Sequence, residues 1–383
     1  MKVRLAALLL AAALLLTLCA LPAAAAPPAV PEIAAPSAVL IDRQSGTVLY
    51  EKNAHERLAP ASVTKIMTLL LVMEALDAGR ISWDDTVTTS EAAAAKGGSQ
   101  VYLAVGEQMP LEEMVKSVVV SSANDCAAAL AEHVAGSEAA FVDLMNTRAA
   151  ELGMADTHFV NCTGLDDTPE AGEHLTSAYD IALMSRALLA HDRIRDYTTI
   201  WMDSVRGGQF GLSNTTKLVR FYPGTTGLKT GFTAAAGYCL SASAMRDGIE
   251  FLAVVLHCAT SDERFSSAKT LLDYAFANFT NLTPELPETE LPVVLGTPER
   301  VRCVLADTAP ILAEKSAAAG AEQVLDLPES VEAPVAQGQQ LGTLTIKSGD
   351  AVLAELPVVA ETEAARLSWW EAAKVIFRRV CFG

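Results

Sequence analysis

The sequence lacks several patterns that would assign it to common enzyme classes. It has no G-x-S-x-G stretch, which excludes the nucleophile elbow of an α/β-hydrolase. It has no H-E-x-x-H stretch and its six histidines are dispersed, so we expect neither a zinc-peptidase site nor another metal cofactor. Its seven cysteines include no C-x-x-C pair and therefore indicate neither a disulfide framework nor a zinc cluster.

Basic residues are also scarce. The chain has 28 lysines and arginines against 46 acidic residues, which gives a formal net charge of -18. Phosphate binding needs a basic surface, so we exclude nucleic acid as a partner. With 383 residues, 51% of them hydrophobic, the chain is long enough to bury a large core and to form two domains.

The first 26 residues have the pattern of an export signal. Lys2 and Arg4 precede a long apolar stretch, and small residues that suit cleavage follow near Ala24 to Ala26. We therefore predict a signal peptide over residues 1–26 and an exported protein. An uncleaved membrane anchor is the alternative.

Residues 36–280 predict one α/β domain of the α+β kind. The stretch "SAVLIDRQSGTVLYEKN" has the pattern of a β-hairpin, and mainly helical periodicity follows from about Ser62 to residue 205. Three β-rich runs then come in order, "TTGLKTGFT", "GYCLSASAM" and "EFLAVVLHC", before the helical "DERFSSAKTLLDYAFANF". An antiparallel sheet with helices packed on it is the simplest layered arrangement of these elements.

A second, smaller domain is predicted after a change in composition. The stretch "TNLTPELPETELP" is rich in proline and acid and indicates a linker. Short β-like runs separated by turns then indicate a small β domain over residues 286–362. This region has no grouping of catalytic side chains, so we expect it to act as a spacer or an interaction module.

The last segment, residues 365–383, predicts an amphipathic helix. At 100° per residue, an arc of about 120° collects the apolar residues, and the charged residues lie opposite. The apolar residues are Trp369, Trp370, Ala373, Ile376, Phe377 and Val380. The helix is too short to cross a bilayer, which takes about 20 apolar residues. Paired tryptophans with basic neighbours favour a membrane-surface anchor, and a terminal helix docked on protein is the alternative.

The stretch "PASVTKIMTLLL" places a serine three residues before a lysine. On a helix, Ser62 and Lys65 share a face, so the lysine amine can reach the serine hydroxyl. The amine acts as a base only if burial or nearby positive charge lowers its pKa. The same spacing recurs at Ser266 and Lys269 on the predicted exposed face of a helix, so on this spacing alone a helix cap at Ser62 is the alternative.

Two further motifs favour a nucleophile. "VVSSANDC" supplies Ser122 and Asn124 at the start of a predicted helix, and "GLKTGFT" supplies Lys229, Thr230 and Gly231 on a predicted strand. S-x-x-K, S-D-N and K-T-G together mark class A β-lactamases and penicillin-binding proteins. Here the second motif has alanine in its middle position, and the three occur in the expected order.

With these motifs, the sequence resembles the low-molecular-mass penicillin-binding proteins, which are serine-type D-alanyl-D-alanine carboxypeptidases. The resemblance includes "APASVTKIMT", "GGSQVYL", "LMNTRAAELGM" and "THFVNCTGLDD", and it covers residues 38–280 closely. It implies a β-lactamase/transpeptidase-like fold. The β-rich region and the tail resemble the second domain and membrane anchor of that family with less specific sequence.

The resemblance implies a role for each motif residue. Ser62 would attack the D-Ala-D-Ala peptide bond and form an acyl-enzyme, with Lys65 as base and Ser122 passing the proton to the leaving amine. Asn124 would bind the substrate backbone and orient Lys65. The amides of Ser62 and Phe232 would form the oxyanion hole.

The terminal carboxylate of such a substrate needs positive charge and hydrogen-bond donors. Lys229 and Thr230, with Gly231 beside them, are the first candidates, and Arg264 is a second. For Arg264 an exposed helix residue is the alternative. Lys229 would also help to keep Lys65 neutral.

The partners implied are peptidoglycan pentapeptide stems, β-lactams as inhibitors, and the membrane surface, at the outer face of the cytoplasmic membrane or in the cell-wall space. A β-lactamase-like hydrolase is one alternative, but no class A E-x-x-L-N stretch lies between Asn124 and Lys229. A non-catalytic penicillin-binding wall protein is the other. The complete set of Ser62, Lys65, Ser122 and Lys229 weighs against it.

Overall fold

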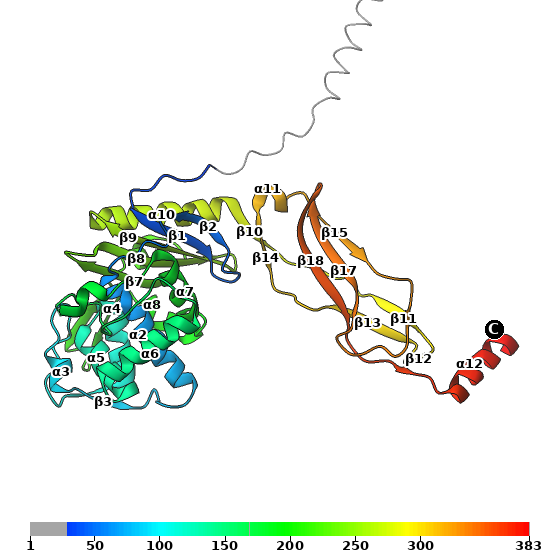
Figure 1. Cartoon of the computed structure of the whole chain (residues 1–383), viewed down its shortest axis with the longest axis horizontal. Coiled ribbons are helices and arrows are strands. Elements are labelled where there is room, and N and C mark those ends of the chain that lie inside the picture. The colour runs from blue at the N-terminus through cyan, green and yellow to red at the C-terminus, as the bar shows by residue number, and fades with distance from the viewer. Residues whose placement is uncertain (1–28, 168, 383) are drawn as a thin grey trace, which may run out of the picture. The chain divides into compact units, whose positions relative to one another are not determined.

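The central sheet of the N-terminal domain has five antiparallel strands in the order β2-β1-β9-β8-β7 in the computed structural model, which describes residues 29–167 and 169–382 (Figure 1). The strands are β1 (Ser37–Asp42), β2 (Val48–Lys52), β7 (Thr225–Thr233), β8 (Gly237–Arg246) and β9 (Ile249–Cys258). The predicted hairpin and the three later β-rich runs all belong to this sheet, which confirms the predicted fold class. The predicted signal peptide lies outside the described residues.

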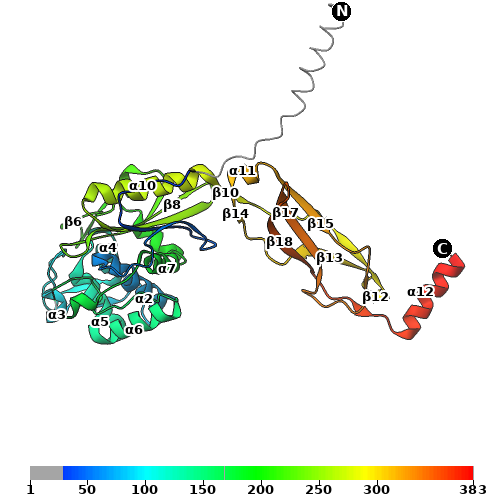
Figure 2. The ribbon, with the colours of Figure 1, turned by 45° about the horizontal axis from the view of Figure 1, so that its top comes forward.

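Helices cover both faces of this sheet. Figures 1 and 2 show α10 (Ser261–Asn278) along one face and the helical block on the other. The short helix α9 (Leu218–Phe221) lies on the α10 side instead, because its Leu218 packs in the same core as α10. The helical block comprises α2 (Lys65–Asp77), α3 (Glu91–Ala94), α4 (Leu111–Ser121), α5 (Asn124–Ala135), α6 (Glu138–Glu151), α7 (Ala178–Leu188) and α8 (Arg195–Thr198). Three 3-10 helices complete it: η1 (Ala61–Thr64), η2 (Pro169–Glu173) and η3 (Asp192–Ile194).

Alternate residues of the strands enter different cores. In β1, Val39 and Ile41 pack with the helical block, whereas Leu40 packs with α10. Because side chains alternate along a strand, a sheet covered on both faces needs strands that are apolar at nearly every position. All six residues of β1 are buried, which is what this arrangement requires.

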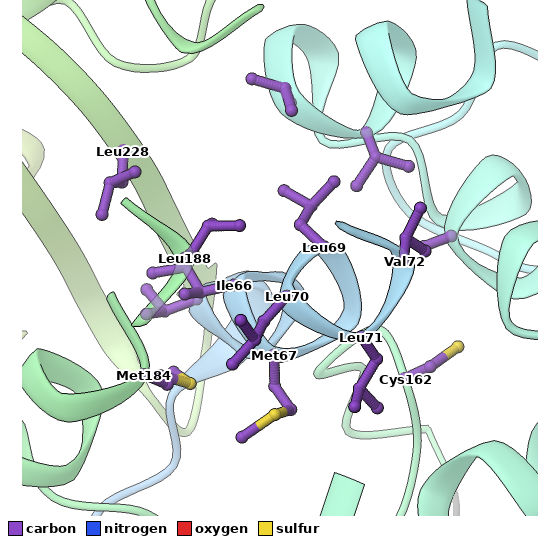
Figure 3. Close-up of a cluster of buried hydrophobic side chains, with 14 of the residues drawn as sticks. Ile66, Met67, Leu69, Leu70, Leu71, Val72, Cys162, Met184, Leu188 and Leu228 are labelled. Atoms are coloured by element: carbon purple, nitrogen blue, oxygen red, sulfur yellow. The ribbon is translucent and has the colours of Figure 1, made fainter. Parts of the chain in front are cut away.

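Helix α2 lies in the centre of the helical block. Its residues from Lys65 to Met73 are all buried, because the sequence "KIMTLLLVM" is apolar around most of its circumference. Figure 3 shows Ile66, Leu70 and their neighbours packed among Met184 and Leu188 of α7 and Leu228 of β7. This packing carries Lys65, at the first turn of α2, into the interior.

Two short antiparallel strand pairs, which the sequence did not predict, lie in the region expected to be helical. Strand β3 (Thr86–Thr88) pairs with β4 (Gln108–Pro110), and β5 (Met202–Val205) pairs with β6 (Phe210–Ser213). Strands of three or four residues are too short to show an alternating pattern.

The C-terminal β-rich region has its own core. Six strands form a sheet in the order β15-β17-β18-β13-β11-β16, around buried residues such as Val301, Leu344 and Val358. The strands of this region are β10 (Phe279–Leu282), β11 (Glu290–Val294), β12 (Gly296–Thr297), β13 (Arg300–Leu305), β14 (Ile311–Glu314), β15 (Ala321–Asp326), β16 (Val331–Glu332), β17 (Gln340–Ser348), β18 (Ala351–Ala360) and β19 (Ala365–Arg366), with the short helix α11 (Lys315–Ala318).

The chain ends in α12 (Trp369–Phe382), where the sequence predicts an amphipathic helix. Trp369, Trp370 and Phe377 are exposed by 74%, 71% and 65%, so these three aromatic side chains of the predicted apolar arc face outward. In the described part of the chain, no helix is both long and apolar enough to cross a bilayer.

Candidate active site

Ser62 lies on the turn that leads into α2. The 3-10 helix η1, which carries Ser62, ends at Thr64, and α2 begins at Lys65 without a break. The two side chains therefore lie about one turn apart, and the Ser62 Oγ is 2.9 Å from the Lys65 Nζ. In this described segment, neither η1 nor α2 starts with a side-chain cap bond. The helix-cap alternative for Ser62 is therefore wrong, and its hydroxyl faces the amine instead.

Lys65 is completely buried, which changes its acid–base behaviour. Its exposed fraction is 0%, and burial lowers the pKa of its ammonium from 10.5 to about 7. Besides Ser62, the Nζ has the carbonyl oxygen of Thr163 as a partner, at 2.8 Å. An amine with a pKa near 7 is partly neutral at neutral pH and can accept a proton from a nearby hydroxyl.

Ser122 and Lys229 form a second polar pair. Lys229 Nζ donates to Ser122 Oγ at 2.7 Å and to its neighbour's carbonyl, Thr230 O, at 3.0 Å. Ser122 has a φ of 63° at the sharp turn between α4 and α5. A left-handed conformation is uncommon for a residue other than glycine and is found where the surrounding structure enforces it, often at functional sites.

The two lysines limit each other's charge. Lys229 is 1% exposed, and burial lowers the pKa of its ammonium well below the usual value. The charges of Lys65 and Arg264 lower it further. Two like charges in a buried site repel strongly, so at least one amine is favoured in its neutral form.

Asn124, the first residue of α5, is held by the loop that contains Gly97. Its Nδ2 donates to the Gly97 carbonyl at 2.7 Å. Its Oδ1 is buried and has no hydrogen-bond partner among the described residues. Lys65 contacts Ser62 and Thr163 rather than Asn124, so among the described contacts Asn124 does not orient the lysine directly. Its unpaired oxygen is instead an acceptor for an incoming donor.

Strand β7 packs directly against the turn that carries Ser62. A Cβ at Gly231 would lie 2.6 Å from Pro60 O and 3.1 Å from Ser62 N, so only glycine permits this approach. Phe232 follows, with its side chain 54% exposed and its ring tilted against that of Tyr238, with 4.3 Å between the ring centroids. The close approach brings the backbone of β7 beside the Ser62 amide.

Thr215 and Arg264 each form a hydrogen bond with this strand. Thr230 Oγ1 donates to Thr215 Oγ1 at 2.7 Å. Arg264, on α10, is 8% exposed and donates to Gly231 O at 3.0 Å. The alternative of an exposed helix residue at Arg264 is therefore wrong. By contrast, Ser266 and Lys269, which repeat the S-x-x-K spacing, lie on the exposed face of α10.

The sequence motifs missed the loop at residues 161–164. Asn161 Oδ1 accepts from Thr163 N and Gly164 N, which folds the loop and presents the Thr163 carbonyl to Lys65. A Cβ at Gly164 would lie only 1.9 Å from Ala61 O. The sequence "NCTG" contains a turn-forming asparagine and glycine, which is the only local signal of this loop.

His174 supports the turn that carries Ser62. Its Nδ1 accepts from Val160 N, so the proton lies on Nε2, which donates to Thr64 Oγ1 at 2.8 Å. Burial lowers the pKa of His174 to about 4, and it is therefore neutral at neutral pH. Among the described residues, no group of three or more His, Cys, Asp or Glu could hold a metal ion.

Comparison with known proteins decides the family. Residues 23–260 match the peptidase S11 family model, described as D-alanyl-D-alanine carboxypeptidase. The D-alanyl-D-alanine carboxypeptidase DacF of Bacillus subtilis is 43% identical over 336 residues, which cover 86% of this chain and 85% of the relative. The chain belongs to the D-alanyl-D-alanine carboxypeptidase family.

Other comparisons extend to the C-terminal region and the fold. Residues 285–366 match the family model of the penicillin-binding protein 5 C-terminal domain. Penicillin-binding protein 5 of Haemophilus influenzae is similar with a TM-score of 0.76 and 28% identity, covering 88% of this chain and 99% of that one. Penicillin-binding protein D2 of Listeria monocytogenes, in its ampicillin-bound form, is similar with a TM-score of 0.59 and 30% identity. The match covers 64% of this chain and 100% of that one. The family and fold that the sequence predicted are confirmed.

Proposed function

We propose that this family member removes the terminal D-alanine from peptidoglycan pentapeptide stems through an acyl-enzyme on Ser62. One observation carries the assignment of the nucleophile: a fully buried amine with a pKa of about 7 lies 2.9 Å from the Ser62 hydroxyl. Ser122 and Lys229, which belong to the Ser-Ala-Asn and Lys-Thr-Gly motifs, form the second polar pair of the site.

The first chemical step forms the ester. Neutral Lys65 accepts the Ser62 Oγ proton while Oγ attacks the carbonyl carbon of the D-Ala-D-Ala bond. The amides of Ser62 and Phe232 stabilise the negative oxygen. The C–N bond then breaks, and the proton passes through Ser122 to the departing D-alanine amine. Water then attacks the ester: its OH completes the carboxyl group of the shortened peptide, and its remaining proton restores the Ser62 hydroxyl.

The remaining residues bind the substrate. Lys229 and Thr230, in the edge strand β7, supply donors and charge for the terminal carboxylate. Arg264 contributes positive charge from behind β7, where it is fixed to Gly231 O. Asn124 accepts a substrate N–H through its unpaired Oδ1.

The test follows the acyl-enzyme. A β-lactam ring carbonyl resembles the scissile amide, so its mass should appear on a peptide containing Ser62, and D-alanine should be released from a pentapeptide. Ser62→Ala should abolish both. Lys65→Ala should slow acylation by about 10²- to 10⁴-fold. Ser266→Ala, in the exposed motif, is the matched control and should change neither.

Each contrary outcome has a meaning. An adduct that persists in Ser62→Ala, or that moves to Ser266, contradicts the assignment of the nucleophile. Rapid turnover of the β-lactam with no release of D-alanine indicates the β-lactamase-like alternative. Stable acylation without D-alanine release indicates a penicillin-binding wall protein.

The two ends of the chain determine the proposed location of the enzyme, and the two domains between them have separate proposed roles. Residues 1–26 serve as a signal peptide that exports the enzyme to the outer face of the cytoplasmic membrane or the cell-wall space. Residues 36–280 form the catalytic domain, residues 286–362 form a β domain that acts as a spacer or interaction module, and residues 365–383 hold the enzyme on the membrane surface. The exposed tryptophans of α12 support the last point.

A further inference from the structure

Glu138 lies outside the three catalytic motifs, yet its carboxylate joins two loops that border them. In the first turn of α6, Glu138 Oε2 accepts from Lys96 Nζ at 2.6 Å. Its Oε1 accepts from Cys162 N at 3.3 Å and from Cys162 Sγ at 3.2 Å. The Lys96 and Glu138 side chains are only 22% and 23% exposed, so this ion pair is mostly enclosed.

One of the two loops holds the proposed base. The Cys162 peptide is fixed at both ends, because Glu138 accepts from its N–H and Thr68 Oγ1 donates to its carbonyl at 2.6 Å. The next carbonyl, that of Thr163, is the partner of Lys65 Nζ. A shift of the Cys162 peptide would therefore move the group that fixes the Lys65 amine.

The other loop holds Asn124. Lys96 directly precedes Gly97, whose carbonyl accepts from Asn124 Nδ2. The Asn124 backbone N–H donates to Ser99 O at 2.7 Å in the same loop. Glu138 thus anchors, through Lys96, the segment that sets the position of Asn124.

We propose that Glu138 is a positioning residue for the acylation step, because its carboxylate fixes residues 96–99 and 161–164 and thereby holds Asn124 and Lys65 in place. This inference rests on the proposed function. An isolated surface ion pair contributes little and is independent of the chemistry. The Glu138 carboxylate differs because it also accepts from the peptide next to the Lys65 partner.

The ion pair also contributes to the charge around Lys65, because both of its members act on the neighbouring Cys162. The titratable groups around the amine are Cys162, His174 and Lys229. Behind them lie Lys96, Glu138, Asp167 and Arg264. Loss of the Glu138 charge leaves the Lys96 cation with only the weaker influence of Asp167 to offset it, which disfavours a proton on Lys65. Loss of the Lys96 charge leaves the carboxylate, which favours that proton.

The experiment measures the second-order rate of acylation by a fluorescent penicillin as a function of pH, with the full chain. Glu138→Ala should acylate about 10- to 100-fold more slowly, since small displacements of catalytic groups have effects of this size. Glu138→Gln should move the acidic limb of the profile to lower pH, and Lys96→Met should move it to higher pH. Opposite shifts are not expected from a purely structural role.

The control removes a similar ion pair, which joins α2 to the helix that carries Glu138. Glu74 pairs with Arg148 of α6 at 2.9 Å, with side chains 24% and 29% exposed. Glu74→Ala and Glu74→Gln should acylate within about twofold of the parent and keep its pH profile. If Glu138→Ala fails to fold, the two opposite shifts in Glu138→Gln and Lys96→Met decide alone.

Other results overturn the inference. Suppose that the parent chain is acylated at Ser62. Glu138 is then not a positioning residue if the Glu138 and Lys96 variants behave as the Glu74 variants do. The same conclusion follows if the acidic limbs of Glu138→Gln and Lys96→Met move in the same direction or do not move. If the parent is not acylated, or Ser62→Ala still is, the proposed function itself fails.

Discussion

At the scale of single residues, Lys65 shows what the sequence could and could not predict. The three-residue spacing placed its amine near Ser62, and the structure places Nζ 2.9 Å from Oγ. The pKa of about 7 could not be predicted, because it follows from burial among elements distant in sequence. Asn124 shows the same limit: its partner is Gly97, in a loop that the motif does not identify.

The lowered pKa of Lys65 predicts how acylation depends on pH. Below about pH 7 the amine is protonated and cannot accept the Ser62 proton, so the rate should fall as pH decreases, approaching about tenfold per pH unit. Stopped-flow measurements of β-lactam acylation over about pH 5 to 9 would show this limb. A rate that stays constant through neutral pH would argue against Lys65 as the base.

At the scale of elements, the sequence placed the strands of the catalytic sheet well. The runs "TTGLKTGFT" and "GYCLSASAM" lie in β7 and β8, where apolar character and flanking turns were clear. The helix expected from about Ser62 instead begins with a 3-10 turn, in which Ala61 has a φ of 49°. This departure depends on Gly164 and Gly231 packing against the turn, which no local pattern shows.

This packing predicts that Gly231 is intolerant of even a methyl group. Gly231→Ala would press a Cβ against Pro60 O and displace the turn, so we expect a loss of stability of about 1–3 kcal/mol. We also expect acylation to slow by about 100-fold. Chemical denaturation and the acylation assay would measure the two effects.

Gly211→Ala is the control for this change. Gly211 also lies in a strand, β6, but a Cβ there would meet nothing within 4 Å. We expect both its stability and its acylation to stay close to those of the parent. Similar effects of the two substitutions would show that close packing against the Ser62 turn is not the cause.

At the scale of the whole molecule, the sequence predicted a catalytic region, a β-rich region and a terminal helix. Composition supports such divisions, because a proline-rich acidic stretch cannot continue either core. The pairing within the β-rich sheet was beyond prediction. Strands β11 and β16, for example, are adjacent and parallel although about 40 residues separate them in the chain.

The terminal helix yields a prediction about location. Removal of residues 368–383 should release the signal-cleaved enzyme from membranes and leave acylation unchanged, because the apolar surface of α12 is lost. This truncation keeps Leu367 N–H bonded to Leu295 O and β19 paired with β12. Membrane fractionation would measure the result, and truncated enzyme that remains with the membrane would contradict the anchor.

A subtler variant tests the same surface. Replacing the exposed Trp369 and Trp370 by serine should weaken the association without removing the helix. Phe221→Ser, which changes an aromatic residue that is 69% exposed in the catalytic domain, is the control and should leave membrane binding unchanged.

The cysteines provide a built-in means to time the opening of each core. The six that the structure describes are free, with Cys381 exposed and the others buried. Burial raises the pKa of the Cys126 and Cys162 thiols well above the usual value, so little reactive thiolate is present in the folded state. A thiol reagent should modify Cys381 at once and the buried cysteines only when their surroundings open. Cys126 and Cys162 belong to the core of the helical block, Cys258 belongs to the core beneath α10, and Cys303 belongs to the core of the β domain. The order in which a mass spectrometer detects their labels would therefore rank the opening rates of the three cores in one native, unmodified protein.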